Sequence, residues 1–190
     1  NMNDRLCIIG IGASAGGLEP LEDFFELVPN RTNLCFVVIQ HLAPDHKSLM
    51  DELLARHTNL PIEIIEDGMV PKSGCIYLNP PKKTVLLDEG AFVLVEKPNK
   101  KLSFPISSFF SSLAEYSEGK CCAIVLSGTG SDGTNGIKDV KEYGGLILAQ
   151  DPAQAKFNGM PNSAIASGMV DSYRHLNPEK VEYSWWSYRA

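Results

Sequence analysis

The chain has 190 residues, of which 44% are hydrophobic and 21% are charged, as in ordinary globular domains. Its formal net charge of −6 argues against a nucleic-acid-binding surface, because such a surface needs clustered Lys and Arg. The five cysteines form no C-x-x-C pair, and no signal peptide or apolar run of about 18 residues is found. These features favour a cytoplasmic protein with no membrane insertion.

The first third of the chain predicts two units in which a buried strand is followed by a helix. Residues 6–11 form an apolar run that ends in glycines, and residues 34–40 form a second apolar run. Such runs are typical of strands that are buried on both faces of a parallel sheet. Apolar residues then recur at helical spacing within 18–29 and within 48–57, which predicts the two helices.

The remaining sequence predicts further strands and helices. Short β-rich runs between 62 and 96 predict antiparallel hairpins added to the α/β body. Helices are predicted over 105–119 and 136–145, and buried strands over 121–127 and 146–150. We therefore expect an α/β fold with three layers: a mainly parallel, doubly wound, Rossmann-like sheet with helices on both faces and an added antiparallel hairpin region.

The glycine-rich string GIGASA, residues 10–15, follows the first predicted strand and is open to two functional interpretations. It matches the dinucleotide pattern G-x-G-x-x-[GA], but the second strand ends in Gln40 and His41 where that pattern requires an acidic residue. The overlapping string GASAG fits G-x-S-x-G, in which a tight turn exposes the hydroxyl of a nucleophilic serine, here Ser14. A structural alternative is that Ser14 caps the following helix.

A nucleophilic serine needs a base and a group that orients the base. His41 directly follows the second predicted strand, so it falls on the same sheet edge as Ser14. Asp132 lies in LSGTGSDGTNG, again between a buried strand and a helix, and could hold the His41 imidazole in the useful tautomer. The structural alternatives are a hydrogen-bonding loop histidine and a helix N-cap at Asp132. The histidines and cysteines lack the spacing of metal ligands, so we expect no metal and no cofactor.

Four ordered segments resemble those of one enzyme family. IGASAGG, IQHLAPDHKS, LSGTGSDGTNG and AQDPAQAKFNGMPNSAI look like segments of the catalytic domain of CheB-type chemotaxis protein-glutamate methylesterases. The resemblance runs from about residue 5 to residue 171. It implies a catalytic domain over 5–171, with 172–190 as a C-terminal tail or a linker.

The resemblance also implies a reaction and a set of site residues. The family hydrolyses γ-glutamyl methyl esters on the cytoplasmic helices of chemoreceptors and deamidates certain receptor glutamines. Ser14, His41 and Asp132 fall on its catalytic serine, histidine and aspartate. The backbone N–H of Ala15 is the first candidate to bind the oxyanion, with the glycine loop at Thr129 and Gly130 as a second.

Two residues depart from the pattern of the stand-alone enzymes. Ala15 stands where many members carry threonine, and Thr129 stands where the stand-alone enzymes usually have methionine. Both variants resemble methylesterase domains of hybrid proteins, so receiver, methyltransferase or sensor domains are further candidate partners. The alternative function is a catalytically weak or inactive interaction module of a hybrid signalling protein.

The segments that border the predicted site suggest contacts for a receptor helix. Met160, Phe157 and Leu42 are the candidate apolar contacts. Lys156 and Lys47 are candidate partners for acidic groups on the receptor surface.

Overall fold

The centre of the molecule is a six-stranded sheet in which every pair of neighbouring strands is parallel. The computed structural model describes residues 6–41, 49–97, 103–174 and 176. The strand order is β3-β4-β2-β1-β7-β8, and a separate antiparallel pair consists of β5 and β6. The strands are β1 (Cys7–Ala13), β2 (Leu34–Gln40), β3 (Ile62–Ile64), β4 (Ile76–Leu78), β5 (Lys83–Asp88), β6 (Ala91–Glu96), β7 (Cys121–Val125) and β8 (Leu146–Ala149). The helices are α1 (Leu18–Glu26), α2 (Met50–Leu54), α3 (Pro105–Ser117), α4 (Thr134–Glu142) and α5 (Gly159–Ala166).

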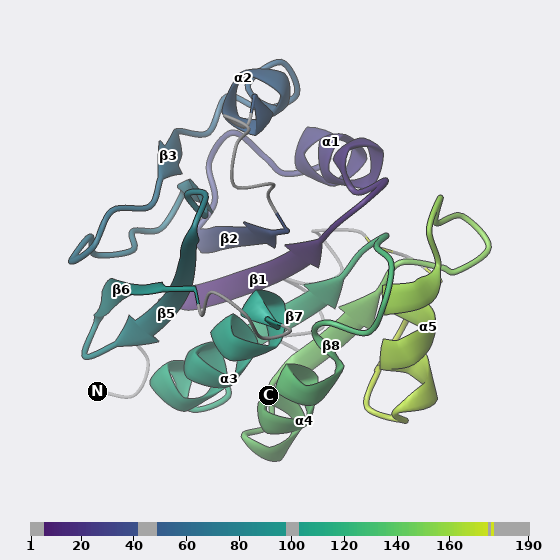
Figure 1. Ribbon diagram of the computed structural model, residues 1–190. Helices are drawn as coiled ribbons and strands as arrows, with labels where there is room; N and C mark the ends of the chain where they lie inside the picture. Colours follow the sequence, from purple (N-terminus) through teal and green to yellow (C-terminus); the bar gives the residue numbers. More distant parts are fainter. Residues whose placement is uncertain (1–5, 42–48, 98–102, 175, 177–190) are drawn as a thin grey trace.

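Helices cover both faces of this sheet, as the sequence predicts. Figure 1 shows α1 and α2 on one side of the strands and α3 and α4 on the other. Successive residues of a strand point to opposite faces, so each strand feeds two cores. In β1, Ile8 packs into the core under α3 and α4, whereas Ile9 packs into the core under α1. This double burial explains why the strands read as continuous apolar runs.

Within the region 62–96, the predicted antiparallel hairpin is confirmed for β5 and β6, and the prediction is wrong for β3 and β4. β3 and β4 are parallel strands of the main sheet, with Ile62 aligned to Ile76, and β4 also pairs with β2. Among the described strands, the antiparallel hairpin is limited to β5 and β6, of which β5 packs on α3. Short apolar runs reveal burial but not strand direction, so the sequence pattern could not separate these two cases.

Two helices also differ from the sequence prediction. The first is α2, which covers Met50–Leu54 and is therefore shorter than the predicted 48–57. The other is α5, Gly159–Ala166, which lies where no helix is predicted. The apolar residues of its sequence, GMPNSAIA, follow the helical period only weakly. We therefore infer that tertiary packing contributes most of the stability of this helix.

The first two glycines of GIGASA serve helix packing. Gly10 and Gly12 lie within β1, paired with β2 and β7, on the face that α3 covers. A Cβ atom on Gly12 would lie 2.4 Å from Ile106 Cγ2, so the missing side chain lets α3 approach the strand. The glycines of a dinucleotide fingerprint form the turn after the strand, and this difference argues against the nucleotide interpretation.

Candidate active site

The candidate site lies at the carboxyl edge of the sheet, where the strand order reverses. Because the strands are parallel, the residues that follow β2, β1 and β7 emerge at one edge, and these strands are neighbours in the order β2-β1-β7. His41, Ser14 and the loop to Asp132 follow these three strands respectively. From β1 the chain continues to β2 on one side, while β7 lies on the other, so this is the topological switch point at which open α/β sheets bind ligands.

His41 and Asp132 form a hydrogen bond across 91 positions of sequence. The distance between His41 Nε2 and Asp132 Oδ2 is 2.6 Å. The Asp132 side chain is 4% exposed, and that of His41 is 38% exposed, so the imidazole reaches from a buried carboxylate towards solvent. This geometry is that of an orienting acid behind a histidine.

The backbone fixes Asp132 as an acceptor. Its Oδ1 accepts hydrogen bonds from the N–H groups of Ser107 and Gly133, at 3.0 and 2.8 Å, and its Oδ2 accepts one from Ile106 at 3.1 Å. An ionised carboxylate can only accept hydrogen bonds, so the group on His41 that faces Asp132 must be a donor, Nε2–H. In a neutral imidazole the other nitrogen, Nδ1, then carries the lone pair. The nitrogen that can act as a base in this arrangement is therefore Nδ1.

Asp132 also caps a helix, although not the one that the sequence suggests. Ile106 and Ser107 belong to the first turn of α3, whose N-terminal N–H groups have no partner within the helix. The helix that follows Asp132 in sequence, α4, has Gly133 as its N-cap and no side-chain cap. The carboxylate thus gains stabilisation from the positive end of the α3 dipole while it holds His41.

Ser14 occupies the turn between β1 and α1. Its N–H donates to Ser127 O at 2.9 Å, and its carbonyl accepts from Gly17 N–H at 3.0 Å, which closes a tight turn. Gly16, the third residue of this turn, has a φ of +75°, a conformation that glycine adopts without strain. The N-cap of α1 is Gly17 and no side chain caps the helix, so the interpretation of Ser14 as the helix cap is wrong.

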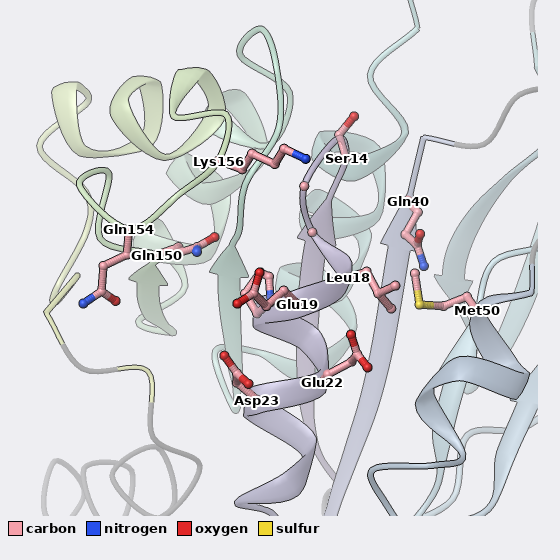
Figure 2. A pocket seen from close by; sticks show the side chains of 13 residues that line it. Ser14, Leu18, Glu19, Glu22, Asp23, Gln40, Met50, Gln150, Gln154 and Lys156 are labelled. Atoms are coloured by element: carbon pink, nitrogen blue, oxygen red, sulfur yellow. The ribbon is translucent and has the colours of Figure 1, made fainter.

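The Ser14 hydroxyl makes no hydrogen bond with another group in the described part of the chain. Of the three predicted site residues, His41 and Asp132 are thus joined by a hydrogen bond. Ser14 follows the neighbouring strand β1, and its hydroxyl has no hydrogen bond to either of them. Figure 2 shows the hydroxyl pointing away from α1. Its side chain is half-buried, which keeps it accessible to a substrate.

Two backbone N–H groups and the loop that leads from β7 to Asp132 border Ser14. Within the described residues, the N–H groups of Ala15 and Gly16 donate to no other group of the chain. A Cβ atom on Gly128 would lie 2.8 Å from Ser14 Cβ, so this loop packs directly against the serine. Thr129 and Gly130 follow as exposed residues of the same loop. Their part in binding an oxyanion stays a prediction.

A groove of about 600 Å³ starts at Ser14 and runs along α1. Three carboxylates of α1 line it, those of Glu19, Glu22 and Asp23, together with polar residues that include Gln40, Gln150, Gln154 and Lys156. In Figure 2 the Lys156 side chain extends towards the Ser14 end of the groove, while the carboxylates lie farther along α1. Neither His41 nor Asp132 lines this groove, so it adjoins the pair instead of enclosing it.

The predicted docking residues divide into three groups. Met160 is completely buried in the core, so its prediction as an apolar surface contact is wrong. Phe157 is 39% exposed and Lys156 is exposed, and their role in docking stays a prediction. Leu42 and Lys47 lie outside the described residues, as does most of the predicted tail at 172–190.

Three further residues connect this region by hydrogen bonds, and the sequence did not predict this role for them. Ser127 holds the Ser14 turn through hydrogen bonds, and Gln150 Oε1 accepts the Ser127 N–H. Ser107 Oγ accepts the N–H groups of Gly133 and Gly136 at 2.9 and 3.1 Å. Their partners lie 23 to 112 positions away in sequence, so no local pattern could identify them.

Neither a metal site nor a membrane helix emerges from the residues that the structure covers. In those residues no group of three or more His, Cys, Asp or Glu side chains is placed to bind a metal ion. Over the same residues, every helix is too short or too polar to span a bilayer.

Comparisons with known proteins point to one family. The family model described as CheB methylesterase matches residues 9–183. A protein-glutamate methylesterase/protein-glutamine glutaminase of Pseudomonas aeruginosa is 35% identical over 164 residues, which are 85% of this chain and 49% of that protein. A putative protein of the same description from Leptospira interrogans is 33% identical over 177 residues, 91% of this chain and 90% of that protein. An uncharacterized 104.1 kDa protein of Rhodobacter capsulatus is 46% identical over 123 residues, which make up 13% of its length.

A solved structure agrees with this result. The crystal structure of the CheB methylesterase catalytic domain of Thermotoga maritima superposes with a TM-score of 0.82 and 28% sequence identity. The match covers 95% of this chain and 97% of that domain. The chain thus has the length of a catalytic domain, and it spans half or less of the Pseudomonas and Rhodobacter relatives.

Proposed function

Because the chain belongs to the CheB methylesterase family, we propose that it hydrolyses γ-glutamyl methyl esters on chemoreceptors, with Ser14, His41 and Asp132 as a catalytic triad. Deamidation of receptor glutamines is the second reaction, as the names of the relatives from Pseudomonas and Leptospira suggest. The observation that carries the proposal is the 2.6 Å hydrogen bond between His41 and Asp132 at the sheet edge where Ser14 follows β1.

In the proposed reaction, the Ser14 hydroxyl attacks the ester carbonyl and transfers its proton to His41 Nδ1. Asp132 stabilises the imidazolium that forms. The tetrahedral intermediate then collapses, and His41 returns the proton to the departing methoxide, which leaves as methanol. Water attacks the acyl-enzyme with His41 again as the base, and the products are glutamate and free Ser14. In the deamidation, the same steps release ammonia.

The oxyanion of the intermediate needs donors that are oriented before the reaction starts. The Ala15 and Gly16 N–H groups are available, because they donate to no other group in the described residues. They lie in the turn that carries Ser14, at the N-terminal end of α1, where the helix dipole favours negative charge. The Ser14–His41 hydrogen bond that the mechanism requires is one that commonly tightens when substrate binds.

The alternative function, an inactive interaction module, rests on Ala15 and Thr129, which depart from the residues of the stand-alone enzymes. Both functions fit the fold, so chemistry at Ser14 separates them. An active enzyme reacts covalently with a serine-directed phosphonate, and the reaction requires His41 as the base. An inactive module gives no such adduct.

The decisive experiment measures methanol release from membranes that contain methylated chemoreceptors. We expect turnover with the native chain and a loss of at least about 10³-fold in Ser14→Ala, because the nucleophile is removed. Ser131→Ala is the matched control, because Ser131 is an exposed serine of the neighbouring loop. Equal methanol release by the Ser14→Ala variant and the native chain would exclude the serine mechanism. No release and no phosphonate adduct with the native chain would establish the inactive module.

A further inference from the structure

We propose that Ser127 is a positioning residue that locks the conformation of the Ser14 turn. This inference rests on the proposed function and adds a residue to its machinery. Ser127 follows β7, is completely buried, and was not among the residues that sequence motifs assign to catalysis. It does not line the groove at Ser14, so it acts through the turn and not on the substrate.

Ser127 joins three segments that meet behind the nucleophile. Its carbonyl accepts the Ser14 N–H at 2.9 Å. Two carbonyl oxygens lie within reach of its hydroxyl proton, Ala15 O at 2.8 Å and Phe157 O at 3.2 Å, and the shorter distance favours donation to Ala15 O. The same hydroxyl oxygen accepts the Phe157 N–H at 3.0 Å. The residue therefore ties the turn after β1 to the loop after β8 as well as to its own strand.

The hydrogen bond to Ala15 O matters because of the peptide it holds. Ser14 to Gly17 form a four-residue turn, and the peptide between Ala15 and Gly16 is its central one. Turns of types I and II differ by a flip of this peptide, and the positive φ of Gly16 is that of the type II form. Since the peptide is planar and trans, fixing the Ala15 carbonyl also fixes the Gly16 N–H on the opposite side. Ser127 thereby determines where one of the two proposed oxyanion donors points.

The position of Ser127 is itself well determined. Its N–H donates to Gln150 Oε1 at 2.8 Å, and the Gln150 N–H donates to Val125 O at 2.8 Å. Packing around the hydroxyl is also tight, because a Cβ atom on Gly16 would lie 2.7 Å from Ser127 Oγ. Strands β7 and β8 thus provide a rigid base from which one hydroxyl controls the turn.

The test compares Ser127→Ala, Ser127→Thr and the matched control Ser117→Ala. Ser117 is also a buried serine whose hydroxyl donates to a carbonyl, that of Leu113 at 2.6 Å, but it lies at the far end of α3. For each variant, kcat and KM are measured on a glutamyl methyl ester, and the active sites are counted by phosphonate titration so that unfolded protein does not contribute. The thermal midpoint is recorded alongside.

We expect Ser127→Ala to lower kcat per titrated site by roughly 10- to 100-fold, with KM changed less than about threefold. The reason is that a misdirected Gly16 N–H loses part of the rate that complete removal of an oxyanion donor would lose. Ser127→Thr, which keeps the hydroxyl, is expected to recover most of the rate. Ser117→Ala is expected to lower the thermal midpoint without changing kcat per site. If Ser127→Ala does not fold, Ser127→Cys replaces it with the same expectation, because a thiol is a weak donor of similar size.

The outcomes separate this inference from the proposed function. If Ser127→Ala keeps the native kcat per site, or if it behaves like Ser117→Ala, the positioning role is wrong while the serine mechanism stands. If Ser127→Thr is as slow as the alanine variant, the hydroxyl is not what matters and the inference also fails. If the native chain shows no turnover and no titratable serine, the proposed function itself fails.

Discussion

Replacing Asp132 by asparagine tests the link between the fold and the proposed chemistry most directly. The carboxylate accepts four hydrogen bonds, from His41 Nε2 and from the N–H groups of Ile106, Ser107 and Gly133. An asparagine has one oxygen and one NH₂ group in their place. If its oxygen takes the position of Oδ1, the NH₂ group faces the Ile106 N–H and His41 Nε2.

Two consequences follow from this geometry. The Ile106 N–H loses its acceptor inside a buried site, which costs about 1–3 kcal/mol, and the first turn of α3 loses a negative charge that is worth up to about 2 kcal/mol. We therefore expect a loss of about 1–5 kcal/mol in the free energy of unfolding and a fall of roughly 2–20 °C in the thermal midpoint. In addition, the NH₂ group stabilises the wrong tautomer of His41, with the proton on Nδ1.

The catalytic effect is larger than the effect on stability. A histidine in the wrong tautomer costs about 10⁴-fold in kcat in serine hydrolases, so ester turnover by Asp132→Asn should fall by a factor of that order. Asp139→Asn is the matched control, because Asp139 of α4 also accepts a hydrogen bond, from Ser111 of α3, and neither residue has a hydrogen bond with Ser14, His41 or Asp132 in the described part of the chain. The assay is ester hydrolysis per folded molecule below the thermal midpoint. A kcat within about tenfold of the native value would refute the reasoning, because His41 would then not depend on Asp132.

Two further predictions concern packing and pH. Gly12→Ala places a Cβ atom 2.4 Å from Ile106 Cγ2, so we expect it to lower the free energy of unfolding in urea by about 1–3 kcal/mol. Gly10→Ala is the control and should cost less, because its nearest contact would be 3.0 Å. A larger loss for Gly10→Ala than for Gly12→Ala would contradict the packing argument. His57 contacts Glu26 and Glu22 of α1, and the hydrogen bond with Glu26 is the largest cause that raises its pKa above 6.5. A raised folded-state pKa means that this stabilisation is complete below the unfolded pKa and is lost as pH rises through the folded pKa. The thermal midpoint of His57→Gln should therefore lie further below that of the native chain at about pH 5.5 than at about pH 8.5, and an equal difference at both pH values would rule this contribution out.

The relation between sequence and site is clearest at Asp132. Its place after a buried strand predicts that it lies on the sheet edge with Ser14 and His41, and the parallel strand order confirms that placement. The sequence also suggests a cap of the following helix, but the carboxylate caps α3 instead. Hydrogen bonds to a helix that starts 27 positions earlier depend on how α3 crosses the sheet, and no local pattern records that crossing.

The sequence by itself determined the strands β1, β2, β7 and β8, most of the helices and the edge at which the candidate triad lies. It could do so because burial on two faces, helical period and glycine turns are local properties of the chain. Only the tertiary structure decided that β3 and β4 join the main sheet, that Met160 lies in the core, and that Ser127 forms hydrogen bonds with the Ser14 turn. Each of these depends on contacts between segments far apart in sequence, and such contacts form only when the whole sheet is assembled.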